Sequence, residues 1–207
     1  MDRKVIQVEP TDNYFSINWQ IGIRCNYDCM YCPPSSHDNT SKHHSLEKLQ
    51  QAWLSIYEKT HHRNLPYKIA FTGGELTTNK NFLPFVNWLR TNYNKDIFKL
   101  LLTTNGSATY KYYSKLFEVL DNISFSIHSE FFDEKKFFDL VVKLKKAISN
   151  DKFIRVEIMN EYWNQERIPK YIELLNANEI SYSLNKITYK YQTRTYPIMQ
   201  GKLNLDI

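Results

Sequence analysis

The chain has 207 residues, of which 15% are aromatic and 24% charged, and this composition excludes a disordered chain because disordered segments are poor in aromatic residues. A net charge of +5 permits an anionic or nucleic-acid partner but is too small to predict one. No apolar run approaches the ~20 residues of a membrane span, and the first residues lack the apolar segment of a signal peptide. We expect a cytoplasmic protein with an N-terminal extension over 1–13, one core domain over 14–188 and a C-terminal tail over 189–207.

Apolar spacing predicts six strands that alternate with five helices. Residues 14–20 alternate polar and apolar side chains, which is typical of a strand, and Ser45 is a good N-cap for the first helix. Alternation with short connections predicts right-handed βαβ units and a parallel sheet. The other strands are expected at 67–71, 98–103, 123–127, 153–158 and 180–187, and the other helices at about 81–93, 110–120, 134–148 and 165–175.

Polar side chains recur on one face of several predicted strands. Ser124 and Ser126 alternate with apolar neighbours in the fourth strand, and Arg155 and Glu157 do so in the fifth. Strands that are buried on both faces of a sheet are instead almost continuously apolar. The pattern therefore favours an incomplete barrel of parallel strands with a polar lumen over an open doubly wound sheet. The alternative is the exposed sheet face of a two-layer α+β protein.

All three cysteines of the chain, Cys25, Cys29 and Cys32, lie in one short run after the first predicted strand. An odd number at this spacing is a poor disulfide framework and favours a metal or cluster site in a reducing compartment. Three thiolates can hold a [4Fe–4S] cluster and leave one of its four irons open to another ligand. The alternative is zinc, because His37 follows Cys32 at the spacing of a zinc knuckle and would complete a site of three cysteines and one histidine.

A second motif, Gly73-Gly74-Glu75, follows the second predicted strand. Glycines at a strand end let a ligand approach the backbone closely, and a glutamate beside them can accept hydrogen bonds from an ammonium group. In parallel barrels the functional groups lie at the carboxyl ends of the strands, and the cysteine run lies at such an end as well. The two motifs therefore predict one shared site.

Together, the cysteine run and this turn resemble the signature of the radical SAM superfamily, a CxxxCxxC loop after the first strand and a GGE turn after the second. The resemblance covers the order of elements over about 14–187 and implies a partial (β/α)6 TIM-like barrel with parallel strands. It implies that the three cysteines ligate a [4Fe–4S] cluster whose open iron chelates S-adenosylmethionine (SAM). By the same resemblance Gly73, Gly74 and Glu75 receive the methionyl ammonium, and Tyr31 lies beside adenine.

Two further segments match positions of the superfamily. The run from Thr103 through Thr104 and Asn105 to a glycine resembles the TTNG turn of many members, which implies that Thr104 and Asn105 contact SAM. Ser126 matches a serine that contacts SAM in molybdopterin-precursor synthases. One departure is Leu76, which stands after the glutamate in place of the common proline.

The chemistry implied by the resemblance is reductive cleavage of SAM to methionine and a 5′-deoxyadenosyl radical, which abstracts hydrogen from a substrate. A flavodoxin or ferredoxin-type electron donor is an implied partner. Possible substrate contacts are His128, Arg155, Glu157 and Lys186, whose mixed charges favour a polar small molecule. The alternatives are a peptide or protein modifier, including an activase of glycyl-radical enzymes, and a structural zinc module that binds RNA.

Overall fold

The computed structural model describes residues 13–161 and 164–187, so nearly all of the expected extension over 1–13 and the whole tail over 189–207 lie outside the described residues. Six strands alternate with five α-helices, as the apolar spacing predicts. The strands are β1 (Phe15–Gly22), β2 (Tyr67–Gly73), β3 (Phe98–Thr104), β4 (Asn122–Ile127), β5 (Phe153–Asn160) and β6 (Ser181–Lys186), and the helices are α1 (Leu46–Thr60), α2 (Phe82–Asn92), α3 (Tyr110–Val119), α4 (Glu134–Ala147) and α5 (Ile168–Ala177).

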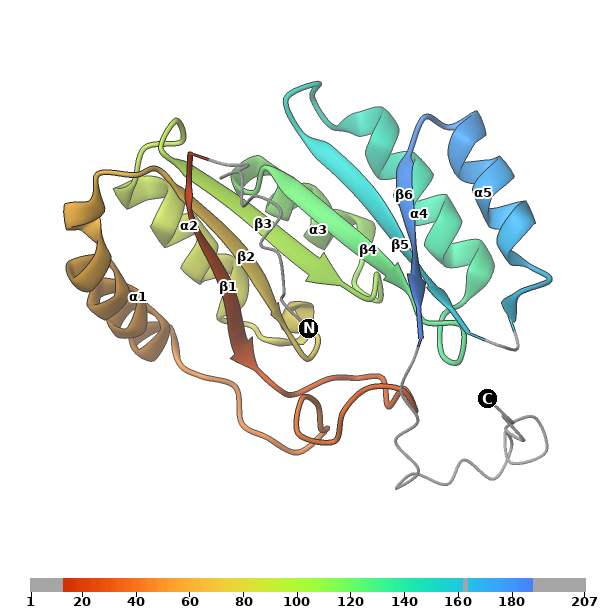
Figure 1. The fold of residues 1–207 in the computed structure, drawn as a ribbon, viewed down its shortest axis with the longest axis horizontal. Coiled ribbons are helices and arrows are strands. Elements are labelled where there is room, and N and C mark those ends of the chain that lie inside the picture. The colour runs from red at the N-terminus through yellow and green to blue at the C-terminus, as the bar shows by residue number, and fades with distance from the viewer. Residues whose placement is uncertain (1–12, 162–163, 188–207) are drawn as a thin grey trace, which may run out of the picture.

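Each strand pairs in parallel with the next one in the chain, so the sheet order is β1-β2-β3-β4-β5-β6. A doubly wound sheet would reverse its strand order partway, and this sheet does not. The helices lie together along one side of the curved sheet (Figure 1). The fold is therefore a partial (β/α)6 barrel, which is open between β1 and β6.

The hydrophobic core fills the space between the sheet and its helices. Trp53 of α1 has no exposed surface, and its ring lies 5.5 Å from that of Tyr67 and 5.6 Å from that of Phe98. Along each central strand alternate residues are buried, such as Ile69 and Phe71 in β2. Full burial of one such side chain stabilises the fold by about 1.5–3 kcal/mol. The residues between them face the other side of the sheet, which forms the lumen.

Side-chain caps set the starts of three helices. Ser45, Thr109 and Asp133 each accept a hydrogen bond from the backbone N–H three residues later, which pairs one of the free donors of the first turn. The last helix differs from the expectation, because α5 begins at Ile168 rather than at 165. A proline, Pro169, lies in its first turn, where the missing N–H costs nothing. None of the described helices is long and apolar enough to cross a lipid bilayer.

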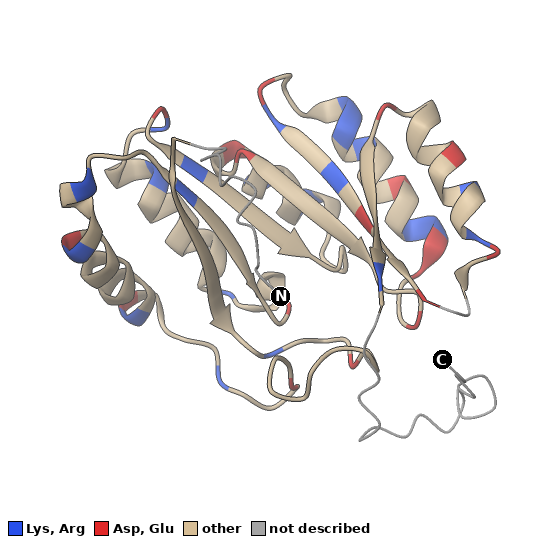
Figure 2. Ribbon diagram, viewed as in Figure 1, with Lys and Arg blue, Asp and Glu red and all other residues tan. Residues whose placement is uncertain are grey.

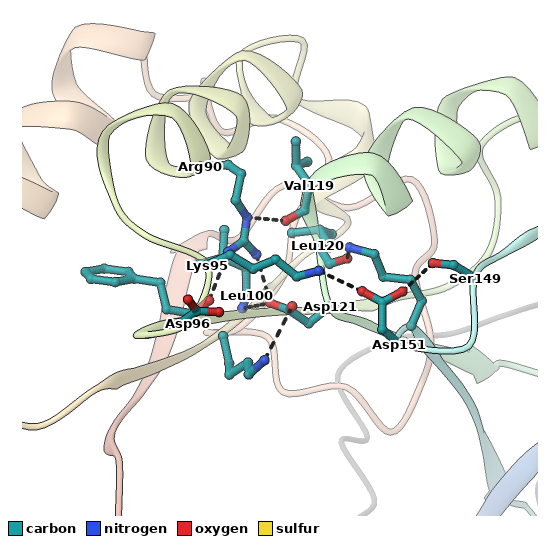
Figure 3. Close-up of polar contacts among 12 residues, drawn as sticks. Arg90, Lys95, Asp96, Leu100, Val119, Leu120, Asp121, Ser149 and Asp151 are labelled. Carbon is teal, nitrogen blue, oxygen red and sulfur yellow. Dashed lines mark hydrogen bonds and ion pairs between the residues drawn. The ribbon is translucent and has the colours of Figure 1, made fainter.

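A network of polar contacts connects β3 and β4 at the amino ends of the strands (Figure 3). The Arg90 guanidinium donates to the carbonyls of Val119 and Phe98 at 2.8 and 3.0 Å and to the Asp121 carboxylate at 2.8 Å. The same carboxylate accepts the backbone N–H of Leu100 at 2.8 Å. These contacts join α2, β3 and the start of β4 at the end of the sheet that is opposite to the two sequence motifs.

Candidate active site

A cavity of about 180 Å³ lies at the carboxyl ends of the strands, where both sequence motifs meet. The three cysteines are all free thiols and all line this cavity. Most of the other residues expected to bind a cofactor line it as well. The lining is formed by Cys25, Tyr27, Cys29, Cys32, His37, Thr72, Gly73, Gly74, Glu75, Thr103, Thr104, Asn105, Ser126, His128 and Met159.

The cysteine loop is closed at its base by backbone hydrogen bonds. Arg24 and Asp38 form an isolated parallel bridge, in which the N–H of Cys25 donates to the Asp38 carbonyl at 2.6 Å and the N–H of Asp38 donates to the Ile23 carbonyl at 2.9 Å. The side chain of Asp38 in turn accepts from the backbone N–H of Ser41 at 2.9 Å. The thiols are therefore carried by a loop whose two ends are joined.

In the zinc alternative His37 would be the fourth ligand, and both of its ring nitrogens already have partners. No group of three or more His, Cys, Asp or Glu side chains among the described residues is arranged as a preformed metal site. His37 contacts the Pro33 carbonyl through Nδ1 and the Asp28 carboxylate through Nε2, both at 3.1 Å. Three free thiols around one cavity match the set of thiolates that holds a [4Fe–4S] cluster with one iron left open.

The two glycines of the turn are required by the chain itself. Gly73 has a φ of +130°, and a Cβ there would lie 2.2 Å from the Gly22 carbonyl oxygen. At Gly74 a Cβ would lie 2.1 Å from the Arg24 carbonyl oxygen. The N–H groups of Gly74 and Glu75 donate to these same two carbonyls at 2.9 Å. The sequence predicted that a ligand would lie close to these two glycines. In part, it is instead the backbone leading into the cysteine loop that lies against them.

Glu75 is buried at the centre of the site, with 1% of its surface exposed. Its Oε1 accepts from the N–H and hydroxyl of Thr77, at 3.0 and 2.6 Å, and from the Thr104 hydroxyl at 2.8 Å. Its Oε2 accepts from the Asn105 N–H at 2.6 Å. Burial raises the pKa of the carboxyl group, while these hydrogen bonds oppose the rise. Because an ionised carboxylate offers about four acceptor positions, Oε2 can accept a further donor.

The turn after β3 links Glu75 to the cysteine loop. The side-chain N–H of Asn105 donates to the Asn26 side-chain oxygen at 2.9 Å, and the Asn26 amide donates to Ser107 at 3.0 Å. Asn26 lies next to Cys25 in the sequence. A chain of hydrogen bonds therefore joins the ends of β2 and β3 to the loop that carries the thiols.

The tyrosine that lines the cavity is not the one that the motif indicates. Tyr31 is absent from the lining; its ring stacks on His128 with centroids 5.9 Å apart, and its hydroxyl bonds to Nδ1 of that histidine. Burial lowers the pKa of His128 to about 4, so the imidazole is neutral near pH 7. Tyr27 lines the cavity instead and stacks on Phe131 at 5.4 Å.

Two glutamates beside the loop, the buried Glu161 and the partly buried Glu130, were not indicated by any motif. The Glu130 carboxylate accepts from the Met30 N–H at 3.1 Å, and Glu161 accepts from the N–H and hydroxyl of Ser129. Burial, together with the nearby Glu130 charge, raises the pKa of Glu161 to about 8. Only tertiary contacts bring these two acids together, and no spacing in the sequence indicates that.

The expected substrate residues divide into two groups. His128 lines the cavity, whereas Arg155 and Glu157 on β5 and Lys186 on β6 do not. The Arg155 Nε lies 3.0 Å from the Glu157 carboxylate. This pair faces the lumen, because the alternate residues of β5 are buried against the helices.

Known proteins resemble this chain over part of its length. A GTP 3′,8-cyclase of Pasteurella multocida (strain Pm70) is 33% identical over 45% of this chain and 26% of the relative. An S-adenosylmethionine-dependent nucleotide dehydratase of Selenomonas ruminantium is 31% identical over 56% of this chain and 39% of the relative. The chain thus spans well under half the length of these curated relatives.

Among solved structures, BtrN in complex with AdoMet and 2-DOIA has 20% identity and a TM-score of 0.49, over 70% of this chain and 56% of that one. The model of the Radical SAM superfamily matches residues 19–157, a segment that runs from β1 to β5 and carries the cysteine loop, the Gly-Gly-Glu turn and the turn after β3. With the motifs gathered around one cavity on a partial parallel barrel, this match shows that the chain belongs to the radical SAM superfamily.

Proposed function

We propose that the chain forms the catalytic core of an enzyme that generates a radical from SAM and uses it on a polar small molecule. The observation that carries this proposal is that three free thiols, with no disulfide between them, line one cavity together with the Gly-Gly-Glu turn. When bound, a [4Fe–4S] cluster with SAM supplies a 5′-deoxyadenosyl radical that abstracts a hydrogen atom.

Cys25, Cys29 and Cys32 are the residues that would hold the cluster. Burial raises the pKa of the Cys25 and Cys29 thiols, and nearby carboxylates raise it further. Thiolates at this site therefore need a cation to balance their charge, since metal ligation requires the deprotonated form. Iron would supply that charge, and the Cys29 side chain is buried from water.

For SAM, we assign the methionyl ammonium to the Gly73-Gly74-Glu75 turn. The free acceptor position on the Glu75 Oε2 and the negative charge of the carboxylate support this assignment. Thr104 and Asn105 hold the carboxylate in place, and the buried Ser126 offers a hydroxyl on the cavity wall. For adenine, Tyr27 joins Tyr31 as a candidate, because Tyr27 lines the cavity.

A polar small molecule is the substrate class that the lumen favours, because hydroxyl, amide and charged side chains face it. The names of the similar proteins, a GTP cyclase and a nucleotide dehydratase, agree with a substrate of this kind. We further propose a flavodoxin or ferredoxin-type protein as electron donor. Peptide substrates, including those of an activase, remain the alternative that substrate tests must address.

Anaerobic reconstitution with iron and sulfide tests the proposed function. We expect about four irons per chain, and formation of 5′-deoxyadenosine from SAM once dithionite is added. Cys29→Ala should lose both signals, whereas Ser35→Ala, an exposed position in the same loop, should keep both. A wild-type protein that binds one zinc ion and never cleaves SAM would overturn the proposal.

A further inference from the structure

A row of polar side chains crosses the lumen face of all six strands, and two of its members, Thr72 and Thr103, also line the cavity. Its members are neighbours in register: Gln20 pairs with Thr72, Thr103 with Ser124, Ser124 with Arg155, and Arg155 with Ser181, while the pairing of Phe71 with Leu102 places Thr72 beside Thr103. All members are exposed or partly exposed. We call this set the polar row, and it consists of Gln20, Thr72, Thr103, Ser124, Arg155 and Ser181.

Arg155 is the one charged member of the polar row, and charge is sparse on the strands in general. Figure 2 shows Lys, Arg, Asp and Glu mainly on helices and loops, with the strands mostly tan. Within the described strands the charged residues are Lys68, Lys99, Arg155, Glu157 and Lys186. Within the polar row, Arg155 places one cation among hydroxyl and amide groups, and this charge favours binding of an anion there.

The surroundings of Arg155 fix its guanidinium and leave its outer edge open. Its Nε is held by Glu157 at 3.0 Å, and the side chain is 45% exposed. The other oxygen of the Glu157 carboxylate accepts from the Ser183 hydroxyl and from the Asn185 amide, the latter at 2.9 Å. Both oxygens of Glu157 are thus engaged in contacts that support Arg155. No side chain of the described residues bonds to the two terminal nitrogens of Arg155.

From this geometry we infer that Arg155 binds an oxyanion of the substrate, either a phosphate or a carboxylate. A guanidinium held through Nε presents two parallel N–H groups, which match two oxygens of such a group. The hydroxyls of Ser124 and Ser181, its neighbours in register on either side, are placed to donate further hydrogen bonds. The inference rests on the proposed function, since it concerns the substrate of the same lumen.

The register also sets how far the anion lies from the reacting end of the substrate. Ser126, on the cavity wall, pairs directly with Glu157, and Arg155 lies two residues before it on β5. Two residues of a strand span about 7 Å. The substrate would therefore carry its oxyanion a few bonds away from the carbon that loses hydrogen, with its polar groups along the polar row.

Calorimetric titration of the anaerobically reconstituted full chain, with SAM present, tests this inference. Pyrophosphate is the phosphate probe and malonate is the carboxylate probe, and the one that binds more tightly identifies the class of oxyanion. Arg155→Gln should weaken binding of that probe by about tenfold or more. Arg155→Lys should also weaken it, because lysine keeps the charge but loses both the paired N–H groups and the contact through Nε.

Lys99→Gln is the matched control, because Lys99 lies on the same face of the sheet, 40% exposed, at a level nearer the amino ends. It removes the same charge, and binding should change by about twofold or less. The inference would be overturned if Arg155→Gln and Lys99→Gln lost the same binding affinity for the probe. It would also be overturned if neither probe bound to the wild type at millimolar concentration. SAM cleavage without substrate is measured in the wild type alongside, and its absence there would count against the proposed function alone.

Discussion

The Glu75 carboxylate at the end of β2 accepts the backbone N–H of Asn105 at the end of β3, with 2.6 Å between nitrogen and oxygen. This hydrogen bond connects the turn assigned to the SAM ammonium with the turn that leads, through Asn26, to the first cysteine. The position of the first thiol and the position of the Glu75 carboxylate are therefore coupled by side chains rather than by the strands alone.

Replacement of Glu75 by glutamine tests that coupling. In one orientation the new amide points its NH₂ group at the Asn105 N–H, and in the other it points this group at Thr77 and Thr104, which then lose their acceptor. Either arrangement lowers the free energy of unfolding by about 1–3 kcal/mol. Loss of the charge should also weaken SAM binding, as measured by equilibrium dialysis of the reconstituted protein. Thr77→Ser, which keeps the hydroxyl, is the control. An unchanged SAM affinity in Glu75→Gln would contradict the role given to Oε2.

Gly22, just before the cysteine loop, and Gly74, which packs against the start of that loop, should respond differently to replacement by alanine. In Gly74→Ala the new Cβ meets the Arg24 carbonyl oxygen at 2.1 Å, whereas at Gly22 a Cβ would meet nothing within 4 Å. We expect Gly74→Ala to lose about 3 kcal/mol of stability and to incorporate less iron. Gly22→Ala should stay within about 0.5 kcal/mol of the wild type. Chemical denaturation and iron analysis measure both effects, and equal behaviour of the two variants would refute the packing argument.

The network around Asp121 should matter for stability and not for the site. Asp121→Ala leaves the largely buried Arg90 guanidinium and the Leu100 N–H without their partner, and we expect a loss of about 3 kcal/mol. Lys95→Gln breaks an ion pair with Asp151 in which both side chains are about half exposed, so its effect should be below about 1 kcal/mol. Thermal unfolding measures both losses. If Asp121→Ala altered SAM affinity in the folded protein, the separation of the two ends of the sheet would be disproved.

Glu161 should make the cofactor-free chain less stable as the pH rises. Burial, with the Glu130 charge, raises the pKa of Glu161 to about 8, compared with about 4.3 in an unfolded chain. The folded state therefore binds this proton more tightly, and its stabilising effect, complete below about pH 4.3, is lost as the pH rises to about 8. Glu161→Gln should be more stable than the wild type at pH 8 and lose this advantage near pH 5.

Glu134 provides a control of opposite sign. The Lys170 ammonium lowers the pKa of this carboxyl group, so its stabilising effect is present at neutral pH and is lost as the pH falls. Glu134→Gln should therefore be less stable than the wild type at pH 8. Denaturation curves at several pH values distinguish the two cases, and parallel pH profiles for both variants would show that the Glu161 pKa is not raised.

The fold could be predicted because its strands and helices have clear apolar periods. The strand expected at 67–71 and the helix expected at 110–120 are found as Tyr67–Gly73 and Tyr110–Val119. The start of α5 could not be placed as well, since the polar residues before Ile168 fit either a helix or a turn. For such a segment, tertiary packing and Pro169 decide the boundary.

The candidate site could be predicted only as far as its motifs extend. Cysteines and glycines at strand ends indicate a shared cavity, and Glu75 and Ser126 do line it. The direction of a loop side chain is different, because it depends on neighbours that are distant in the sequence. Tyr31 turns to His128, about a hundred residues later in the chain, while Tyr27 takes the cavity wall. Glu161 was missed for the same reason.

The bridge between Arg24 and Asp38 has a consequence for the arrival of the cofactor. In an open loop, binding a cluster would have to restrict the backbone of every residue between the first thiol and the last, at an entropic cost that grows with loop length. Here the hydrogen bonds at Cys25 and Asp38 join the two ends of the loop. A cluster therefore has less backbone to order, and its insertion should require a smaller adjustment than the folding of an open loop.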